Sequence, residues 1–363
     1  MTLTAAHNSH IAVLAISSAF PQHLHKQDKV LEAFIKRTPL SVEDQLFAKR
    51  VYPLTLIETG SSALSEDDLY RKMDRTEFAN FCKKNLLALA LEAAKKALSN
   101  WGGNILDITH IIWGTTTVVM DMPTPDAILI QRLGLSPFVK RVCVQHMGCL
   151  TGYRCMSLAY SIAKGDPNSR ILVVAADLRS TLGNQLGEHF SRTSIIECAM
   201  FRDAGGCCII GVPNTDDKPL VKILNHESVT IPDTGFLAHI SEANDAEIIL
   251  HIDRQLPDYV EKYSLSLINR LLQGTNVSIN ALSFAAHSGG PKILKLLQKG
   301  LGVEQSALES SWSYLKTHGN CSGGGNIPIL DLELNKTNVS TPYICCLSMG
   351  PGFTMDCMLL ERY

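Results

Sequence analysis

The sequence predicts an α/β fold in which helices pack on the faces of a β-sheet. Apolar runs rich in β-branched residues, such as residues 171–176 and 207–212, alternate with stretches whose apolar residues recur at helical spacing, such as 78–99. Two segments also follow one plan, because residues 142–148 and 282–291 each lead from a strand through a polar turn toward a helix. The alternation favours a sheet covered by helices, and the recurring plan indicates a structural duplication.

Each expected element rests on a local pattern. Short apolar runs that end in polar or turn residues predict buried strands at 11–16, 110–117, 142–145, 170–176, 207–212, 220–224, 281–286, 342–347 and 354–360. Helical spacing of apolar residues, together with Gly and Pro stops, predicts helices at 78–99, 151–164, 256–272, 291–299, 305–318 and 323–335, with a further one between the loop 121–126 and Gly134. The charge-rich stretch 26–80 is expected to form surface helices and loops. A hydrophilic patch at 213–219 divides the chain into predicted halves 1–213 and 214–363.

The composition indicates a cytoplasmic protein without a membrane span. The 363 residues are 45% hydrophobic, and the formal net charge of -2 offers no basic surface for nucleic acid. The eleven cysteines are odd in number and never spaced as CxxC, which favours reduced thiols over disulfides or a zinc site. The first nine residues lack the features of a signal peptide, and no apolar run approaches 18 residues.

Cys149 is the candidate nucleophile. It lies where the strand-like run 141–145 gives way to the helical pattern 151–164. At such a junction the open N–H groups of the helix N-terminus favour a thiolate. The alternative is structural, since a free cysteine usually behaves as a small buried hydrophobe.

Two downstream segments supply partners of the right chemistry. His287 follows an apolar run and precedes Ser-Gly-Gly-Pro, where the glycines allow a ligand to approach, although a histidine after a strand is more often scaffolding. Asn320 lies in a glycine-rich loop that lacks the spacing and the lysine of a phosphate-binding loop. A thiolate, an imidazole and an amide can hold an acyl group and stabilise an oxyanion. Papain-like proteases use the same three residue types, so the types alone leave the reaction open.

The sequences around these three residues indicate which reaction they catalyse. Gly148-Cys149 before a helix, residues 286–291 and residues 319–322 together resemble the type III polyketide synthases, the chalcone and stilbene synthase family, which share the thiolase fold. The similarity extends over residues ~75 to 363, and it includes the segments 108–122, 133–149, 201–205 and 349–353. It implies two similar α/β halves that form a five-layered αβαβα core.

The resemblance also implies roles for individual residues. Cys149 is expected to accept the acyl group, and His287 and Asn320 to promote decarboxylation of malonyl-CoA. Phe201 resembles a gatekeeper, and Met122 resembles a methionine that reaches the partner's cavity in a homodimer. Further expected cavity residues are Thr117, Arg179, Leu182, Leu250, Ser322, Gly350, Pro351 and Gly352. Of the basic residues that usually meet the CoA phosphates, only Arg50 is evident, with Lys49 beside it.

Arg179, Leu182 and Leu250 depart from the plant pattern. A buried arginine is costly unless it is paired, so Arg179 is expected to pair with Asp177 or Glu197. The alternative is that Arg179 binds a carboxylate on the starter or on the growing chain. Leu250 in place of a phenylalanine favours an aliphatic starter.

The resulting hypothesis is a type III polyketide synthase. It would load an acyl-CoA starter on Cys149 and extend it with malonyl-CoA to give a pyrone, a resorcinol-type product or a related polyketide. CoA thioesters would be the only small-molecule partners, with no cofactor and no metal. The alternatives are a single-condensation ketoacyl synthase III-like enzyme and a catalytically silent protein of the same fold.

Overall fold

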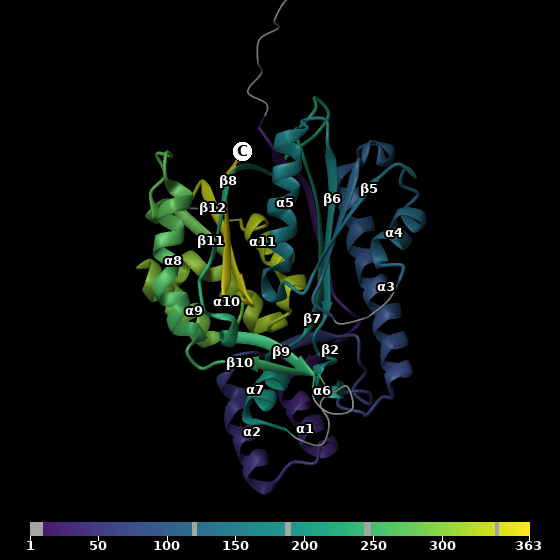
Figure 1. The fold of residues 1–363 in the computed structure, drawn as a ribbon, viewed down its shortest axis with the longest axis vertical. Coiled ribbons are helices and arrows are strands. Elements are labelled where there is room, and N and C mark those ends of the chain that lie inside the picture. Colours follow the sequence, from purple (N-terminus) through teal and green to yellow (C-terminus); the bar gives the residue numbers. More distant parts are fainter. Residues whose placement is uncertain (1–9, 118–121, 186–189, 243–247, 338–340) are drawn as a thin grey trace, which may run out of the picture.

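The structure is a computed structural model that describes residues 10–117, 122–185, 190–242, 248–337 and 341–363. These residues form a mixed sheet of nine strands. The strand order is β11-β12-β13-β8-β1-β7-β6-β4-β5 (Figure 1). The strands are β1 (Ala12–Ala19), β2 (His23–Lys26), β3 (Thr59–Ser62), β4 (His110–Thr115), β5 (Lys140–Gln145), β6 (Arg170–Leu178), β7 (Asp203–Gly211), β8 (Val221–Thr230), β9 (Ala238–Glu242), β10 (Ile248–Ile252), β11 (Leu282–Ala286), β12 (Tyr343–Gly350) and β13 (Thr354–Arg362). The helices are α1 (Gln27–Arg37), α2 (Val42–Leu54), α3 (Arg75–Trp101), α4 (Pro125–Leu133), α5 (Thr151–Gly165), α6 (Leu182–Gln185), α7 (Arg192–Met200), α8 (Leu256–Leu272), α9 (Pro291–Leu301), α10 (Glu309–His318) and α11 (Asn326–Leu334).

The two halves of the sheet repeat one topology. In the first half, β1 pairs antiparallel with β7, β7 pairs antiparallel with β6, and β6 pairs parallel with β4. In the second half, β8, β13, β12 and β11 are joined in the same order and with the same directions. The halves meet where β1 and β8 share a short antiparallel contact. The division expected at residues 213–219 falls between β7 and β8.

Three apolar clusters separate five layers. One cluster joins α5 and α11 to the inner faces of both halves of the sheet. A second cluster packs α3 and α4 on the outer face of the first half, and a third packs α8 and α9 on the outer face of the second half. Figure 1 shows this succession, with α3 and α4 at one side, α5 and α11 in the middle and α8 and α9 at the other. The predicted αβαβα fold is therefore confirmed.

Two expected elements are shorter than their sequence patterns. The strand expected at 110–117 ends at Thr115, because the N–H groups of Thr116 and Thr117 turn to the carboxylate of Asp177. The helix expected at 323–335 begins as a 3₁₀ turn over Ser322–Gly325, from which the Gly324 N–H also reaches Asp177. In both places a buried carboxylate accepts backbone N–H groups that a longer strand or helix would use.

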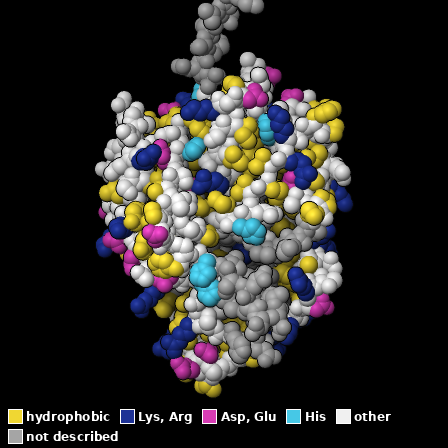
Figure 2. Space-filling view, viewed as in Figure 1, with side chains coloured by type: hydrophobic (Ala, Val, Ile, Leu, Met, Phe, Trp, Pro, Cys, Tyr) yellow, Lys and Arg dark blue, Asp and Glu magenta, His cyan; other side chains and the backbone are white. Residues whose placement is uncertain are grey.

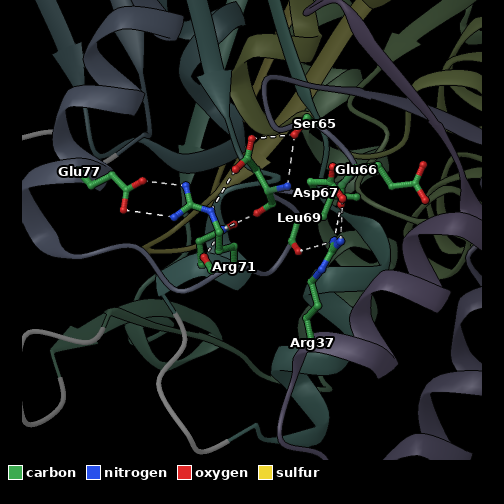
Figure 3. A network of polar contacts seen from close by, with 9 residues as sticks. Arg37, Ser65, Glu66, Asp67, Leu69, Arg71 and Glu77 are labelled. Atoms are coloured by element: carbon green, nitrogen blue, oxygen red, sulfur yellow. Dashed lines mark hydrogen bonds and ion pairs between the residues drawn. The ribbon is translucent and has the colours of Figure 1, made fainter.

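A small cap of α1, α2 and α7 covers one end of the sheet (Figure 1). Polar contacts hold its connecting loop in place (Figure 3). Arg37, at the end of α1, donates to the backbone oxygens of Glu66 and Leu69. Arg71 forms ion pairs with Asp68 in the same loop, at 3.0 Å, and with Glu77 on α3, at 2.7 Å. The cap is thereby tied to α3 beside the larger sheet.

The surface carries mixed charge. On the face drawn in Figure 2, Lys and Arg side chains are interspersed with Asp and Glu. Among the described residues, no helix is long and apolar enough to cross a membrane. The same residues contain no group of three or more His, Cys, Asp or Glu side chains placed to hold a metal ion.

Candidate active site

Cys149 lies at the bottom of a turn between β5 and α5. His146 and Gly148 both adopt positive φ, of 60° and 59°, and the chain then forms a 3₁₀ turn over Gly148–Leu150 that leads into α5. A Cβ at position 148 would lie 2.3 Å from Cδ of Pro351, so only glycine fits there. This turn presents Cys149 to a cavity of about 770 Å³ at the start of a helix.

His287 extends from the end of β11 into the same cavity. Its backbone N–H donates to the oxygen of Leu347 at 2.8 Å, and its Nδ1 lies 3.2 Å from Oδ1 of Asn326. The Nδ2 of Asn326 donates to the backbone oxygen of Cys149 at 2.8 Å, which leaves Oδ1 to accept from the ring. Nδ1 therefore carries a hydrogen, and Nε2 is left for the cavity, where it has no regular hydrogen bond within the described part of the chain.

Cys149 and His287 favour each other's charged forms. Burial alone would raise the pKa of Cys149, but the charge of the nearby His287 and the contact with the Ser322 hydroxyl outweigh it and lower the pKa. Burial alone would lower the pKa of His287, but the neighbouring Cys149 and the hydrogen bond with Asn326 raise it. The two shifts have opposite signs, as a thiolate–imidazolium pair requires.

Asn320 is the third polar group at this end of the cavity. Its Oδ1 accepts from the backbone N–H of Ser322 at 2.9 Å, which turns Nδ2 the other way. Nδ2 makes a long contact of 3.4 Å with the oxygen of Gly289, so one of its two hydrogens can be donated to a ligand. Cys149, His287 and Asn320, which lie far apart in the sequence, all line this cavity.

Asn326 and Asp177 position these groups, and the sequence did not single out either for that role. Asn326 contacts both Cys149 and His287. Asp177 accepts from the N–H groups of Thr116, at 2.6 Å, and Gly324, at 2.9 Å, and thus joins two loops of the cavity wall. One feature of the sequence pointed to Asn326, because this residue ends the same glycine-rich motif that contains Asn320.

Seven of the ten expected substrate-binding residues line the cavity. They are Phe201, Arg179, Leu250, Ser322, Gly350, Pro351 and Gly352. The hydroxyl of Ser322 lies 3.6 Å from the sulfur of Cys149. One face of α7 forms a further wall, with Thr193, Ile196, Glu197 and Met200 at helical spacing. Ile196, Met200 and Leu250 contribute apolar aliphatic side chains to the lining.

Three of the expected substrate-binding residues are not among the described lining residues of this chain's cavity. Thr117 does not line the cavity within the described residues, because its hydroxyl and N–H bond to Asp177, and Thr116 lines it instead. Leu182 is buried in α6 outside the described lining. Met122 is 92% exposed and belongs to no wall of the cavity in a single chain.

The cations that line the cavity differ from the two expected to contact CoA. Lys49 and Arg50 are exposed on α2 and are not among the described lining residues. Arg254, just before α8, and Lys292, in the first turn of α9, are exposed and do line the cavity. Neither cation forms an ion pair within the part of the chain that the structure describes. Arg254 and Lys292 are isolated charges that belong to no sequence motif, so the sequence did not predict that they line the cavity.

The pairing expected for Arg179 is wrong. Neither carboxylate oxygen of Glu197 has a hydrogen-bond partner among the described residues, and the recorded bonds of Asp177 come from backbone N–H groups and threonine hydroxyls. Arg179 instead contacts the backbone oxygen of Thr116 at a long 3.5 Å and lies over the ring of Phe201. Arg179 interacts electrostatically with both carboxyl groups, but no recorded ion pair or hydrogen bond joins it to either of them among the described residues.

Comparison with known proteins identifies the family. The family model for the N-terminal domain of chalcone and stilbene synthases matches residues 2–214, and the model for the C-terminal domain matches residues 228–362. The chain belongs to the chalcone and stilbene synthase family. The first match ends beside the division expected after residue 213.

Similar proteins within this family are type III polyketide synthases. Type III polyketide synthase C of Arabidopsis thaliana is 27% identical over 377 residues, which cover 98% of this chain and 96% of that protein. Probable polyketide synthase 1 of Dictyostelium discoideum is 30% identical over 298 residues, and the match spans 79% of this chain but 9% of that longer protein.

Solved structures agree with this family assignment. The C-terminal type III polyketide synthase domain of Steely1, from Dictyostelium, has a TM-score of 0.91 and 25% identity, with coverage of 97% of this chain and 99% of that one. CsyB complexed with CoA-SH has a TM-score of 0.90 at 22% identity, covers 97% of this chain and 100% of that chain, and supports the fold alone. This member of the chalcone and stilbene synthase family is thus a condensing acyltransferase of the type III polyketide synthase kind.

Proposed function

We propose that this synthase loads an acyl group on Cys149 and extends it with malonyl-CoA. The observation that carries the proposal is the convergence of Cys149, His287 and Asn320 on one cavity. In the loading step the thiolate of Cys149 attacks the thioester carbonyl, the sulfur–acyl bond to Cys149 forms, and CoA leaves as its thiol with a proton from solvent. The lowered pKa of Cys149 increases the fraction of the thiol present as the nucleophilic thiolate.

His287 and Asn320 then act on malonyl-CoA. Loss of CO2 leaves an enolate, whose oxygen accepts from Nε2–H of His287 and from Nδ2–H of Asn320. Because Nδ1 donates to Asn326, a hydrogen on Nε2 requires the imidazolium form, and the enolate replaces the thiolate as its counter-charge. The enolate carbon attacks the acyl carbonyl, the new C–C bond forms, and Cys149 leaves as the thiolate. This chemistry needs no strong base, and we propose that it uses no cofactor beyond CoA thioesters.

The cavity supports repeated extension of an aliphatic starter. Its volume of about 770 Å³ lies in the range typical of pockets that enclose a whole small molecule. Leu250, Ile196 and Met200 supply aliphatic walls, which suits a pyrone, a resorcinol-type product or a related polyketide. A single condensation, as in a ketoacyl synthase III-like enzyme, would leave most of this volume unused.

Incubation with malonyl-CoA and a panel of short, aromatic and long-chain acyl-CoAs tests this function. Mass spectrometry of the products should show chains longer by two or more acetate units, and Cys149→Ala should form none of them. A single acetate unit in every product would favour the ketoacyl synthase alternative. Absence of CO2 release from malonyl-CoA would instead favour a catalytically silent protein.

We propose that Lys292 and Arg254 bind the phosphates of CoA. Both are exposed cations that line the cavity, and an ammonium or guanidinium group readily binds a phosphate oxygen. We expect Lys292→Met to raise the KM for malonyl-CoA about tenfold with a smaller effect on kcat, since one charged hydrogen bond is worth about 1.5–3 kcal/mol. Steady-state kinetics check this, with Lys49→Met as the matched control. Equal effects of the two substitutions would contradict it.

We propose a homodimer that uses the edge of the sheet near β5. β5 is the last strand of the sheet, and Met122 and Phe138 beside it are 92% and 91% exposed. An open edge strand with exposed apolar neighbours favours pairing with a second chain. In this arrangement Met122 would reach the partner's cavity.

A further inference from the structure

Two buried charged side chains in the cavity have no role in the chemistry above. Arg179, in the loop after β6, is 8% exposed, and its Nε has no hydrogen-bond partner among the described residues. Its Cζ lies 5.2 Å from the ring centre of Phe201, and its one recorded hydrogen bond is the 3.5 Å contact with Thr116. A buried guanidinium with so few partners is costly, so the protein maintains a cation here without a counter-ion bonded to it.

Glu197 faces the same space from α7. It is 2% exposed, and both of its carboxyl oxygens lack partners within the described residues. Burial raises its pKa to about 8 even though the charge of Arg179 opposes the rise. Near neutral pH the group is therefore mostly protonated, and its O–H is available as a hydrogen-bond donor.

We propose that Arg179 and Glu197 bind a carboxylate carried by the acyl group on Cys149. The substrate class would be the CoA monothioesters of short dicarboxylic acids. Nε and the neighbouring Nη of a guanidinium match the two oxygens of a carboxylate, and the O–H of Glu197 supplies a third bond. This inference rests on the proposed loading of Cys149 and adds the chemistry of what is loaded.

Two other anions fit this position less well. The carboxylate of the malonyl extender must lose its charge as CO2 departs, so a guanidinium bonded to it would stabilise the ground state and slow the reaction. The CoA phosphates lie outside the acyl group, whereas Arg179 is buried close enough to Cys149 to lower its pKa. Lys292 and Arg254 are exposed and therefore better placed for phosphates.

The test compares the loading of charged and neutral acyl groups of equal length. Purified protein is incubated with glutaryl-CoA or valeryl-CoA, and separately with succinyl-CoA or butyryl-CoA. Intact-protein mass spectrometry then gives the rate constant for acylation of Cys149. The wild-type protein should load the charged member of each pair about tenfold faster. The ratio within one variant cancels any change in thiolate content or in folded fraction.

Arg179→Met should reduce this ratio about 10- to 100-fold, the range expected for charged hydrogen bonds. Arg179→Lys should give an intermediate ratio, because it retains the charge without the guanidinium fork. Glu197→Ala should reduce the ratio more than Glu197→Gln, because the amide of glutamine can still donate a hydrogen bond to the carboxylate of the acyl group. The exposed Arg270→Met is the matched control for net charge and should leave the ratio unchanged.

An equal rate for charged and neutral acyl groups in the wild-type protein would overturn the inference. A ratio that stays within twofold in Arg179→Met would do the same. Both results leave the proposed function standing, since neutral acyl groups would still load. If no acyl-CoA acylates Cys149, the proposed function fails and the carboxylate site fails with it.

Discussion

At the scale of single residues, the chemistry depends on how His287 is held. Its Nδ1 is fixed by Asn326, so Nε2 can take the proton of Cys149. The thiolate exists above the lowered pKa of Cys149, and the imidazolium exists below the raised pKa of His287. Both shifts therefore favour the ion pair, which is lost as the pH falls through the pKa of Cys149 or rises through the pKa of His287.

This arrangement predicts the effect of His287→Gln on alkylation. Without the imidazolium the thiolate loses its main stabilising charge, so the pKa of Cys149 should rise toward or above the value of about 8.5 for a free thiol. The pH profile of iodoacetamide labelling should move to higher pH, with a slower rate at pH 6–7. Mass spectrometry of the peptide that contains Cys149 isolates its reaction from other thiols, most of which are buried with raised pKa. Identical profiles for the two proteins would show that no ion pair forms.

Local sequence predicted some residues of the site and missed others. Cys149, His287 and Asn320 each follow a strand-like run or lie among glycines, which are patterns visible within about ten residues. Glu197 has no such context, because its importance comes from the unsatisfied hydrogen bonds of its carboxyl group inside the cavity. Whether two charges in one stretch form an ion pair depends on side-chain directions that the sequence does not contain.

At the scale of elements, Asp177 holds the ends of two loops together. It follows the core of β6 and accepts N–H groups from Thr116 and Thr117 after β4 and from Gly324 before α11. The periodicity of apolar residues predicted that these helices and strands exist. It did not predict that the strand after residue 110 ends at Thr115 or that the helix expected from residue 323 begins as a 3₁₀ turn. Both features arise from contacts between segments more than 60 residues apart in the chain, which local propensity cannot register.

Asp177→Ala should therefore destabilise the fold. It leaves the backbone N–H groups of Thr116 and Gly324 buried without their recorded acceptor, at about 1–3 kcal/mol for each unsatisfied group, and the relief from removing a buried charge offsets part of this. We expect a loss of about 3 kcal/mol in the free energy of unfolding, measured by urea denaturation. The exposed Asp216→Ala is the control and should change stability by less than about 0.5 kcal/mol. A midpoint for Asp177→Ala equal to that of the control would contradict a structural role.

At the scale of the whole molecule, the duplicated topology places the site. The turn between β5 and α5 carries Cys149, and the turn after β11, the strand that corresponds to β4 in the first half, carries His287. The central helices α5 and α11 pack in one cluster between the halves, so both turns open toward one cavity. The plan shared by residues 142–148 and 282–291 does not join equivalent strands, because β5 has no counterpart among the described strands of the second half. The two halves join into one sheet where β1 pairs with β8. The sequence did not predict this contact, because only two residue pairs form it.

The same topology leaves β5 at the edge of the sheet as described, where we propose that two chains meet. If Met122 lies in the interface, Met122→Glu would bury an unpaired carboxylate there and should raise the dimer dissociation constant tenfold or more. Sedimentation velocity over a range of concentrations measures this change. Leu265→Glu introduces the same charge on α8, in the opposite outer layer, and should leave the dimer intact. Equal dissociation constants for both variants would place the interface elsewhere, and the product spectrum of Met122→Glu would then match that of the wild-type protein.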